Sequence, residues 1–208
     1  MIVAGDYGYV WIFDGASWTV GSGGDEDARV WASGPDDVFK VAGEAGIGHF
    51  DGSTWQAMEH GTTVYLNDVW GRSGNDVYAV GVNGTVLHYD GQSWQPMQSN
   101  TTEQLRAIWG NSEIGVAVGD HGTILHCMNG QWLSETSPAT GTLTGVWGAS
   151  SSDIYAVGPS ESLHYDGSQW STISEIGGSQ VWGRSSDDVY VLQSSRILRY
   201  GPTPAQGR

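Results

Sequence analysis

The stretch that decides the fold runs from Leu66 to Met97 and reads LNDVWGRSGNDVYAVGVNGTVLHYDGQSWQPM. β-branched and aromatic residues gather in four short segments, at 67–70, 76–80, 85–89 and from Trp94 onward. Glycine, asparagine, aspartate and serine fill the segments between them, as the backbone of tight turns requires. The stretch therefore predicts four short strands, here called a to d in chain order.

This unit repeats along the chain with a period of about 38 residues. Strand a carries one tryptophan per unit, usually followed by glycine, at Trp31, Trp70, Trp109, Trp147 and Trp182. Strand d opens on a second tryptophan, directly after a turn, at Trp18, Trp55, Trp94, Trp132 and Trp170. Two markers share one period and account for ten of the 11 tryptophans, so the repeat is real.

Four strands in about 38 residues are typical of a β-propeller blade. A blade has two apolar faces and needs a neighbour on each side. Strands b and c are expected six times, and strands a and d five times. We therefore predict an all-β propeller of about six four-stranded blades, in which the first blade lacks strand a and the last lacks strand d. Either six blades form with two of them three-stranded, or the chain is part of a longer ring.

The predicted propeller covers residues 1–201, with repeat units near 1–29, 30–68, 69–107, 108–145, 146–180 and 181–201. Residues 202–208 contain two of the six prolines and no strand pattern, so we expect a loose C-terminal tail.

The repeat pattern VWGxSxxDVYAVGxxGTxLHYDGxxW resembles the tectonin-type repeat and the Asp-box (BNR-like) propeller repeats, over essentially the whole chain up to about Tyr200. It departs from the Asp-box in two ways: the spacing from Asp90 to Trp94 is one residue shorter, and His88 stands in place of the leading serine. The tectonin resemblance implies a six-bladed propeller that in some members acts as a lectin. It implies no catalytic residues.

A histidine recurs on strand c, at His49, His88, His126 and His164. Equivalent positions in different blades lie far apart, whereas zinc needs its ligands about 2.0–2.1 Å away, so we expect no metal site. A hydrogen bond within each blade is the better interpretation, with the aspartate of strand b as partner, at Asp37, Asp76, Asp153 and Asp188. Gly115 replaces this aspartate in one unit and Arg199 replaces the histidine in the last, so those blades should be built differently.

Aspartates also precede the glycine of the c–d turn, at Asp14, Asp51, Asp90 and Asp166. They are expected to cap backbone N–H groups in Asx turns.

Composition limits the partners. The chain has 8 basic and 23 acidic residues, a net charge of −15, which disfavours nucleic acid and anionic membrane surfaces. No apolar run approaches the ~18 residues of a membrane span, so no membrane insertion is expected. The single cysteine, Cys127, excludes an internal disulfide. Phosphate loops and nucleophile elbows are absent from the sequence, so we expect neither an enzyme nor a cofactor.

The expected location is extracellular or on the cell surface. One lysine, seven arginines and an acidic balance suit a secreted or surface protein. The first residues, Met1 to Gly5, carry neither a basic segment nor a long apolar one and predict no signal peptide. Either the protein is cytoplasmic, or the chain is a mature or excised fragment.

Strand alternation puts the a–b and c–d turns on one face of the predicted ring, and the b–c and d–a loops on the other. The second set varies between units, and binding groups tend to lie on such loops. We therefore expect a protein-interaction or structural scaffold, with a carbohydrate-binding propeller as the alternative, and a protein or a glycan as the partner. The predicted contact residues are Tyr7, Asn83, Asp120 and His121. Incomplete terminal blades further predict self-association.

Overall fold

The computed structural model of the chain describes residues 2–4, 9–13, 16–22, 28–42, 46–174 and 177–200. These residues form 22 strands in six antiparallel sheets, in which the strands follow one another in chain order. The first and last sheets have three strands, and the other four have four each. The predicted all-β propeller, with an incomplete first and last blade, is confirmed. The expected tail at 202–208 lies outside the described residues.

The sheets are numbered here as blades 1 to 6. Blade 1 contains β1 (Ile2–Ala4), β2 (Tyr9–Phe13) and β3 (Trp18–Ser22). Blade 2 contains β4 (Arg29–Gly34), β5 (Asp37–Ala42), β6 (Gly46–Phe50) and β7 (Trp55–Met58). Blade 3 contains β8 (Leu66–Ser73), β9 (Asp76–Gly81), β10 (Val86–Tyr89) and β11 (Trp94–Met97).

Blade 4 contains β12 (Leu105–Gly110), β13 (Gly115–Gly119), β14 (Ile124–Met128) and β15 (Gln131–Ser134). Blade 5 contains β16 (Gly145–Ser150), β17 (Asp153–Val157), β18 (Ser162–Tyr165) and β19 (Trp170–Ser174). Blade 6 contains β20 (Gln180–Ser185), β21 (Asp188–Gln193) and β22 (Arg196–Tyr200).

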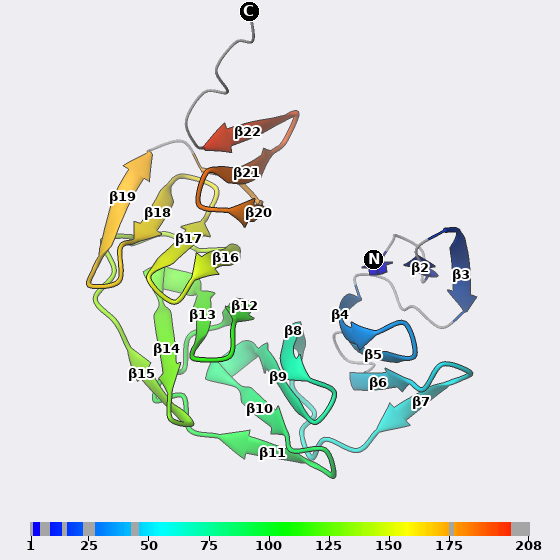
Figure 1. Ribbon diagram of the computed structural model, residues 1–208. Helices are drawn as coiled ribbons and strands as arrows, with labels where there is room; N and C mark the ends of the chain where they lie inside the picture. Colours follow the sequence, from blue (N-terminus) through cyan, green and yellow to red (C-terminus); the bar gives the residue numbers. More distant parts are fainter. Residues whose placement is uncertain are drawn as a thin grey trace, which may run out of the picture.

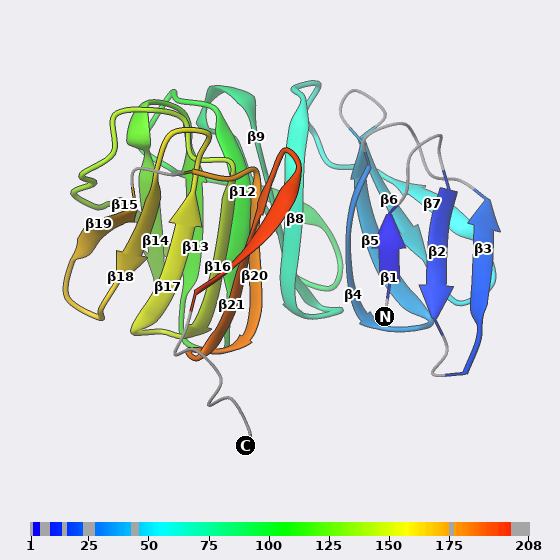
Figure 2. The same cartoon turned by 90° about the horizontal axis from the view of Figure 1, so that it is seen from above.

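The blades are arranged around a central channel, with strand a innermost and strand d at the rim (Figure 1). Strand a of each blade from β4 to β20 contacts strand a of the next. In Figure 1 blades 1 and 6 stand apart across an opening, and Figure 2 shows the same arrangement from a direction at right angles to the first. The described residues contain no helix that is long and apolar enough to cross a membrane.

One detail of the unit from Leu66 to Met97 differs from the prediction. The segment 71–75 was expected to be a turn, but β8 continues to Ser73. The pairing with β9 shifts register between Gly71 and Ser73, which is the mark of a β-bulge. Strand a is therefore longer than its apolar residues suggested.

The strand a tryptophan of one blade packs against the strand a glycine of the next blade. A Cβ on Gly71 would lie 2.8 Å from the Trp31 ring of the blade before, and one on Gly110 would lie 2.7 Å from Trp70. The same holds for Gly148 against Trp109 and for Gly183 against Trp147. Each ring thus needs a glycine on the next blade, because real Cβ atoms do not approach so closely. Blade 2 carries Ala32 at this position, and no strand a is described in blade 1.

The second tryptophan series fills the space between blades, as predicted. Trp94, Trp132 and Trp170 are 5%, 2% and 7% exposed. Each belongs to a buried apolar cluster that joins its own blade to the preceding one. In blade 1 the equivalent Trp18 is 46% exposed, and on blade 6 the side chains of Trp182, Leu192 and Ile197 are exposed as well. The two blades beside the opening therefore present apolar surface.

The predicted hydrogen bonds within the blades are present. His49 Nε2 donates to Asp37 Oδ1 at 2.6 Å, and His88 Nε2 donates to Asp76 Oδ1 at 2.8 Å. His164 makes the same bond to Asp153 at 2.6 Å. Among the residues that the structure describes, no three His, Cys, Asp or Glu side chains gather as a metal ion would require.

Two blades are built differently, as their sequences predicted. In blade 4, which has Gly115 in place of the aspartate, His126 Nδ1 donates to Glu135 Oε1 at 2.7 Å. Glu135 Oε2 also accepts a hydrogen bond from Trp170 Nε1 of blade 5 at 2.7 Å. In blade 6, Arg199 takes the histidine's place and pairs with Asp188 at 3.0 Å.

The Asx turns are also confirmed where the structure describes them. Oδ1 of Asp51, Asp90 and Asp166 each accepts two backbone N–H groups of the following turn. Asp14 lies outside the described residues. These aspartates are therefore turn residues on the face that carries the a–b and c–d turns.

Candidate functional site

The face that carries the b–c and d–a loops is called here the variable face. Two of its b–c turns, called here tips, have nearly identical backbones. They are Val82–Gly84 and Asp120–Gly122, and both are single 3₁₀ turns between strands b and c. Asn83 and His121 adopt left-handed φ values of 55° and 53°. A Cβ on either tip glycine would collide with a backbone carbonyl of the following d–a loop, which explains why glycine stands there. Tips and d–a loops therefore pack on each other and hold this face in shape.

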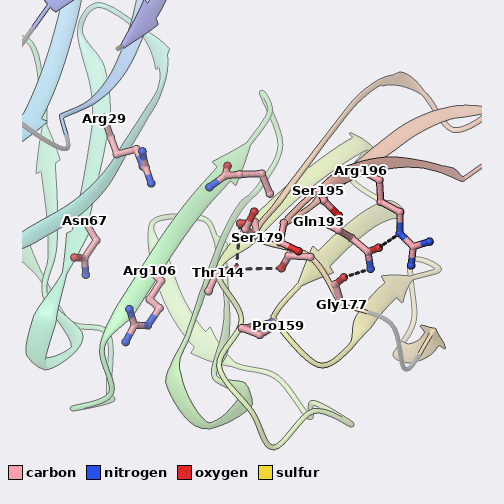
Figure 3. A pocket seen from close by; sticks show the side chains of 13 residues that line it. Arg29, Asn67, Arg106, Thr144, Pro159, Gly177, Ser179, Gln193, Ser195 and Arg196 are labelled. Carbon is pink, nitrogen blue, oxygen red and sulfur yellow. Dashed lines mark hydrogen bonds between the residues drawn. The ribbon is translucent and has the colours of Figure 1, made fainter. Parts of the chain in front are cut away.

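A pocket of about 790 Å³ opens at the mouth of the central channel on this face. Its walls come from blades 2 to 6: the starts of four innermost strands, the segment 177–180 and the turn 193–196 (Figure 3). Its volume is in the range of sites that hold a sizeable ligand. The lining residues are Arg29, Asn67, Arg106, Thr144, Pro159, Gly177, Gly178, Ser179, Gln180, Gln193, Ser194, Ser195 and Arg196.

The lining is basic although the whole chain carries a net charge of −15. It includes three of the seven arginines, Arg29, Arg106 and Arg196, and no aspartate or glutamate. The other described arginines, Arg72, Arg184 and Arg199, pair with aspartates of strand b, at the opposite ends of their strands. Positive charge therefore gathers at one end of the channel.

Arg106 is held in place by the carboxylate of Asp120, which does not line the pocket. Its Nε donates to Asp120 Oδ1 at 2.5 Å and its Nη2 donates to Asp120 Oδ2 at 3.1 Å. Thr142 Oγ1 donates to the same carboxylate at 3.1 Å. The Arg106 hydrogen bond is the main reason why the pKa of Asp120 lies below its usual value. Asp120 thus balances the charge of Arg106.

Arg29 and Arg196 make no ion pair with any residue in the described part of the chain. Both are exposed. Arg196 Nε donates to Gln193 Oε1 at 2.8 Å, and Gln193 Nε2 donates to the carbonyl of Gly177 at 2.7 Å (Figure 3). This chain of bonds orients the Arg196 guanidinium without neutralising it.

The structure places the predicted contact residues in different environments. Asp120 supports Arg106 from behind, and His121 extends into solvent with its side chain 79% exposed. His121 Nδ1 donates to Glu103 Oε2 at 2.7 Å, and this bond raises the pKa of the imidazole. Asn83 lies on the tip of blade 3, and Tyr7 is outside the described residues. Their role as ligand contacts stays a prediction.

Asn83 lines a second hollow, called here the rim groove, of about 920 Å³. The groove runs beside β10 and β11 and under the segments 60–62 and 98–102. Its walls contain no aspartate, glutamate, lysine or arginine, and hydroxyl and amide groups dominate them. Its chemistry is therefore that of a neutral polar site.

The channel-mouth pocket was not predicted from the sequence. Arg29 lies two residues before its strand a tryptophan, Arg106 three residues before, and Arg196 follows strand b of the last blade. These positions are not equivalent in the repeat, so aligning the units does not bring them together. The usable signal is scarcity, because so acidic a chain has only seven arginines and each is a candidate for a specific contact.

Comparison with known proteins supports the fold only. No protein-family model and no curated protein matches the chain. Among solved structures, the chain is similar to "YCF48 bound to D1 peptide", with a TM-score of 0.65 and 17% identity, over 97% of this chain and 77% of that one. It is similar to the WD40 β-propeller domain of Doa1, with a TM-score of 0.75 and 13% identity, over 95% and 73%.

It is also similar to the computationally designed protein Ika8, with a TM-score of 0.71 and 13% identity, over 96% of this chain and 70% of that one. Together with the six sheets, these likenesses define the class: the chain is a β-propeller. The resemblance to tectonin-type and Asp-box repeats stays a prediction.

Proposed function

We propose that this propeller is a protein-interaction module whose partner binds at the mouth of the central channel. The observation that carries the proposal is the 790 Å³ pocket on the variable face, with walls from five blades. A site built on the ends of packed strands is rigid, and a rigid site binds without a large ordering cost. Such a surface suits an extended segment of another protein.

The polar groups of the pocket support a peptide ligand. Asn67, Gln180 and Ser195 offer donors and acceptors that match the N–H and C=O groups of a peptide backbone. One structural neighbour, YCF48, is bound to a D1 peptide, which shows that a propeller of similar shape can hold such a ligand. The described residues in the pocket include no nucleophile paired with a base, so binding is the function that the pocket supports best.

A matched pair of blocking variants tests the proposal. Ser195 and Ser186 are exposed serines in turns at opposite ends of blade 6, and Ser195 alone lines the pocket. Peptides that bind the wild type would first be selected from a random display library. Their affinities would then be measured for Ser195→Trp and Ser186→Trp.

We expect Ser195→Trp to weaken the selected peptides at least tenfold, because an indole at this position fills part of the pocket. Ser186→Trp should bind them as the wild type does. A library that yields no binder, or two variants that weaken binding equally, would contradict a peptide site at the channel mouth.

A sugar-binding function is the second candidate, and the uncharged rim groove favours it. Asn83, Gln98 and Thr102 line the groove and make no side-chain hydrogen bond with a described residue, so their polar groups are available. The predicted contacts on the tips extend this candidate to Asp120 and His121.

A glycan array decides whether sugar is bound at all. Asn83→Gly and His121→Gly then separate the two sugar hypotheses, because glycine accepts the left-handed backbone at both positions. Loss of binding in Asn83→Gly alone supports the rim groove. Loss in both variants supports the predicted tips. If no glycan on the array binds, the sugar-binding hypothesis is wrong.

A further inference from the structure

The charges that line the channel mouth are not equivalent. Asp120 balances Arg106 with two hydrogen bonds, whereas Arg29 and Arg196 have no carboxylate partner among the described residues. One further carboxylate, Asp68, lies close enough for Arg29 to lower its pKa, but its oxygens accept the backbone N–H groups of Val69 and Ile108. Among the described residues, Arg29 and Arg196 are therefore the pocket arginines whose charge no carboxylate balances through an ion pair.

These two arginines belong to opposite sides of the pocket. Arg29 begins β4 of blade 2, and Arg196 begins β22 of blade 6. In Figure 3, Thr144, Ser179 and Gln193 lie between them. A ligand that satisfies both arginines must carry two separate anionic groups, and a polar stretch between those groups would face hydroxyls and amides.

Guanidinium groups bind carboxylates through paired, charge-assisted hydrogen bonds. The pocket has the volume for several residues of an extended chain rather than for one small ion. The open turn 193–196 and the exposed start of β4 leave both ends of the pocket accessible to such a chain.

We infer that the partner segment is an extended acidic peptide with two carboxylates, one bound by Arg29 and the other by Arg196. Arg106 contributes less, because Asp120 already occupies two of its five N–H groups. This inference rests on the proposed peptide-binding function and specifies its ligand. The chain as a whole repels acidic molecules at long range, so recognition depends on these short-range contacts and on the spacing of the carboxylates.

The test uses capped octapeptides of glycine and serine that carry two glutamates, one glutamate, or two glutamines. In the series with two glutamates, one to five residues separate them. Affinity for the fluorescently labelled peptides is measured at fixed ionic strength with the wild type, Arg29→Gln, Arg196→Gln and Arg184→Gln. Arg184→Gln is the matched control, because it removes the same charge from the opposite face.

We expect one spacing of two glutamates to bind at least tenfold more tightly than the single-glutamate peptide, and the glutamine peptide to bind weakest. Arg29→Gln and Arg196→Gln should each lose about tenfold and abolish the advantage of the second glutamate. Arg184→Gln should change affinity by less than twofold.

Equal affinity for glutamate and glutamine peptides would overturn the inference, and so would equal losses in all three variants. The proposed function would survive that result if Ser195→Trp still weakened peptides from the unbiased library. It would fail separately if that library yielded no peptide whose binding depends on the pocket.

Discussion

At the scale of single residues, glycine after the strand a tryptophan is explained by the ring that rests on it. An added Cβ on Gly148 would collide with the Trp109 ring, whereas a Cβ on Gly34 would meet nothing within 4 Å. We expect Gly148→Ala to lower the free energy of unfolding by about 2 kcal/mol, the usual cost of overpacking. Gly34→Ala should stay within about 0.5 kcal/mol of the wild type. Urea unfolding measures both free energies. Equal stability of the two variants would contradict the close packing of the Trp109 ring on Gly148.

Asp68 should give the chain an unusual dependence on pH. Burial is the main reason why the pKa of this carboxyl rises from 3.8 to about 6, against the effect of its two backbone hydrogen bonds. A raised pKa means that the folded state holds the proton more tightly. The stabilisation from Asp68 is therefore complete below pH 3.8 and is lost as the pH rises through about 6.

The stability difference between the wild type and Asp68→Asn, measured from pH 4 to pH 7, should shift steadily against the wild type. Asp166 provides the opposite case, because the Ser168 hydroxyl and the turn N–H groups lower its pKa to about 2. Its stabilisation is present above the unfolded pKa and is lost on acidification. A stability difference for Asp68→Asn that does not vary with pH would contradict this account.

At the scale of elements, Glu135 on the segment after β15 joins two blades. It accepts hydrogen bonds from His126 of its own blade and from Trp170 of the next one. The His126 bond lowers the Glu135 pKa most, ahead of the opposing effect of burial and the smaller contribution of Trp170. Stability from this group is therefore present at neutral pH and is lost as the pH falls below the carboxyl's ordinary range.

We expect Glu135→Ala to lower the free energy of unfolding by about 2 kcal/mol at pH 7, because a mostly buried histidine and an indole N–H lose their acceptor. The difference should shrink at low pH. Glu59→Ala, at an exposed glutamate, should have no comparable effect. Equal thermal unfolding curves for the two variants would show that the Glu135 link between the blades contributes no stability.

The elements also show which features a sequence can predict. Strand order recurs along the whole chain, and the His–Asp bonds and Asx turns recur in blades 2, 3 and 5, so the comparison of units exposes them. Glu135 was not predicted because it lies on the segment after β15, outside the repeat pattern, where it accepts the His126 hydrogen bond in place of the aspartate that blade 4 lacks. The arginines of the channel mouth were missed for a related reason: the arrangement of blades 2 to 6 around the channel, rather than a shared repeat position, brings Arg29, Arg106 and Arg196 to one pocket.

At the scale of the whole molecule, the opening between blades 1 and 6 has apolar walls. Trp18 is 46% exposed on one side, and Trp182 and Ile197 are 39% and 58% exposed on the other. Apolar surface of this kind favours association. We therefore expect the 208-residue chain to form concentration-dependent oligomers in light scattering. Ile197→Lys should reduce them, and a chain that is monomeric at every concentration would contradict the expectation.

The central claim is that a partner segment binds at the channel mouth between Arg29 and Arg196. A crystal structure with the tightest two-glutamate peptide tests it most directly. We predict the peptide within the 790 Å³ pocket, with one carboxylate within hydrogen-bond distance of each arginine. A peptide that binds instead in the rim groove, or on the face that carries Arg72 and Arg184, would contradict the account.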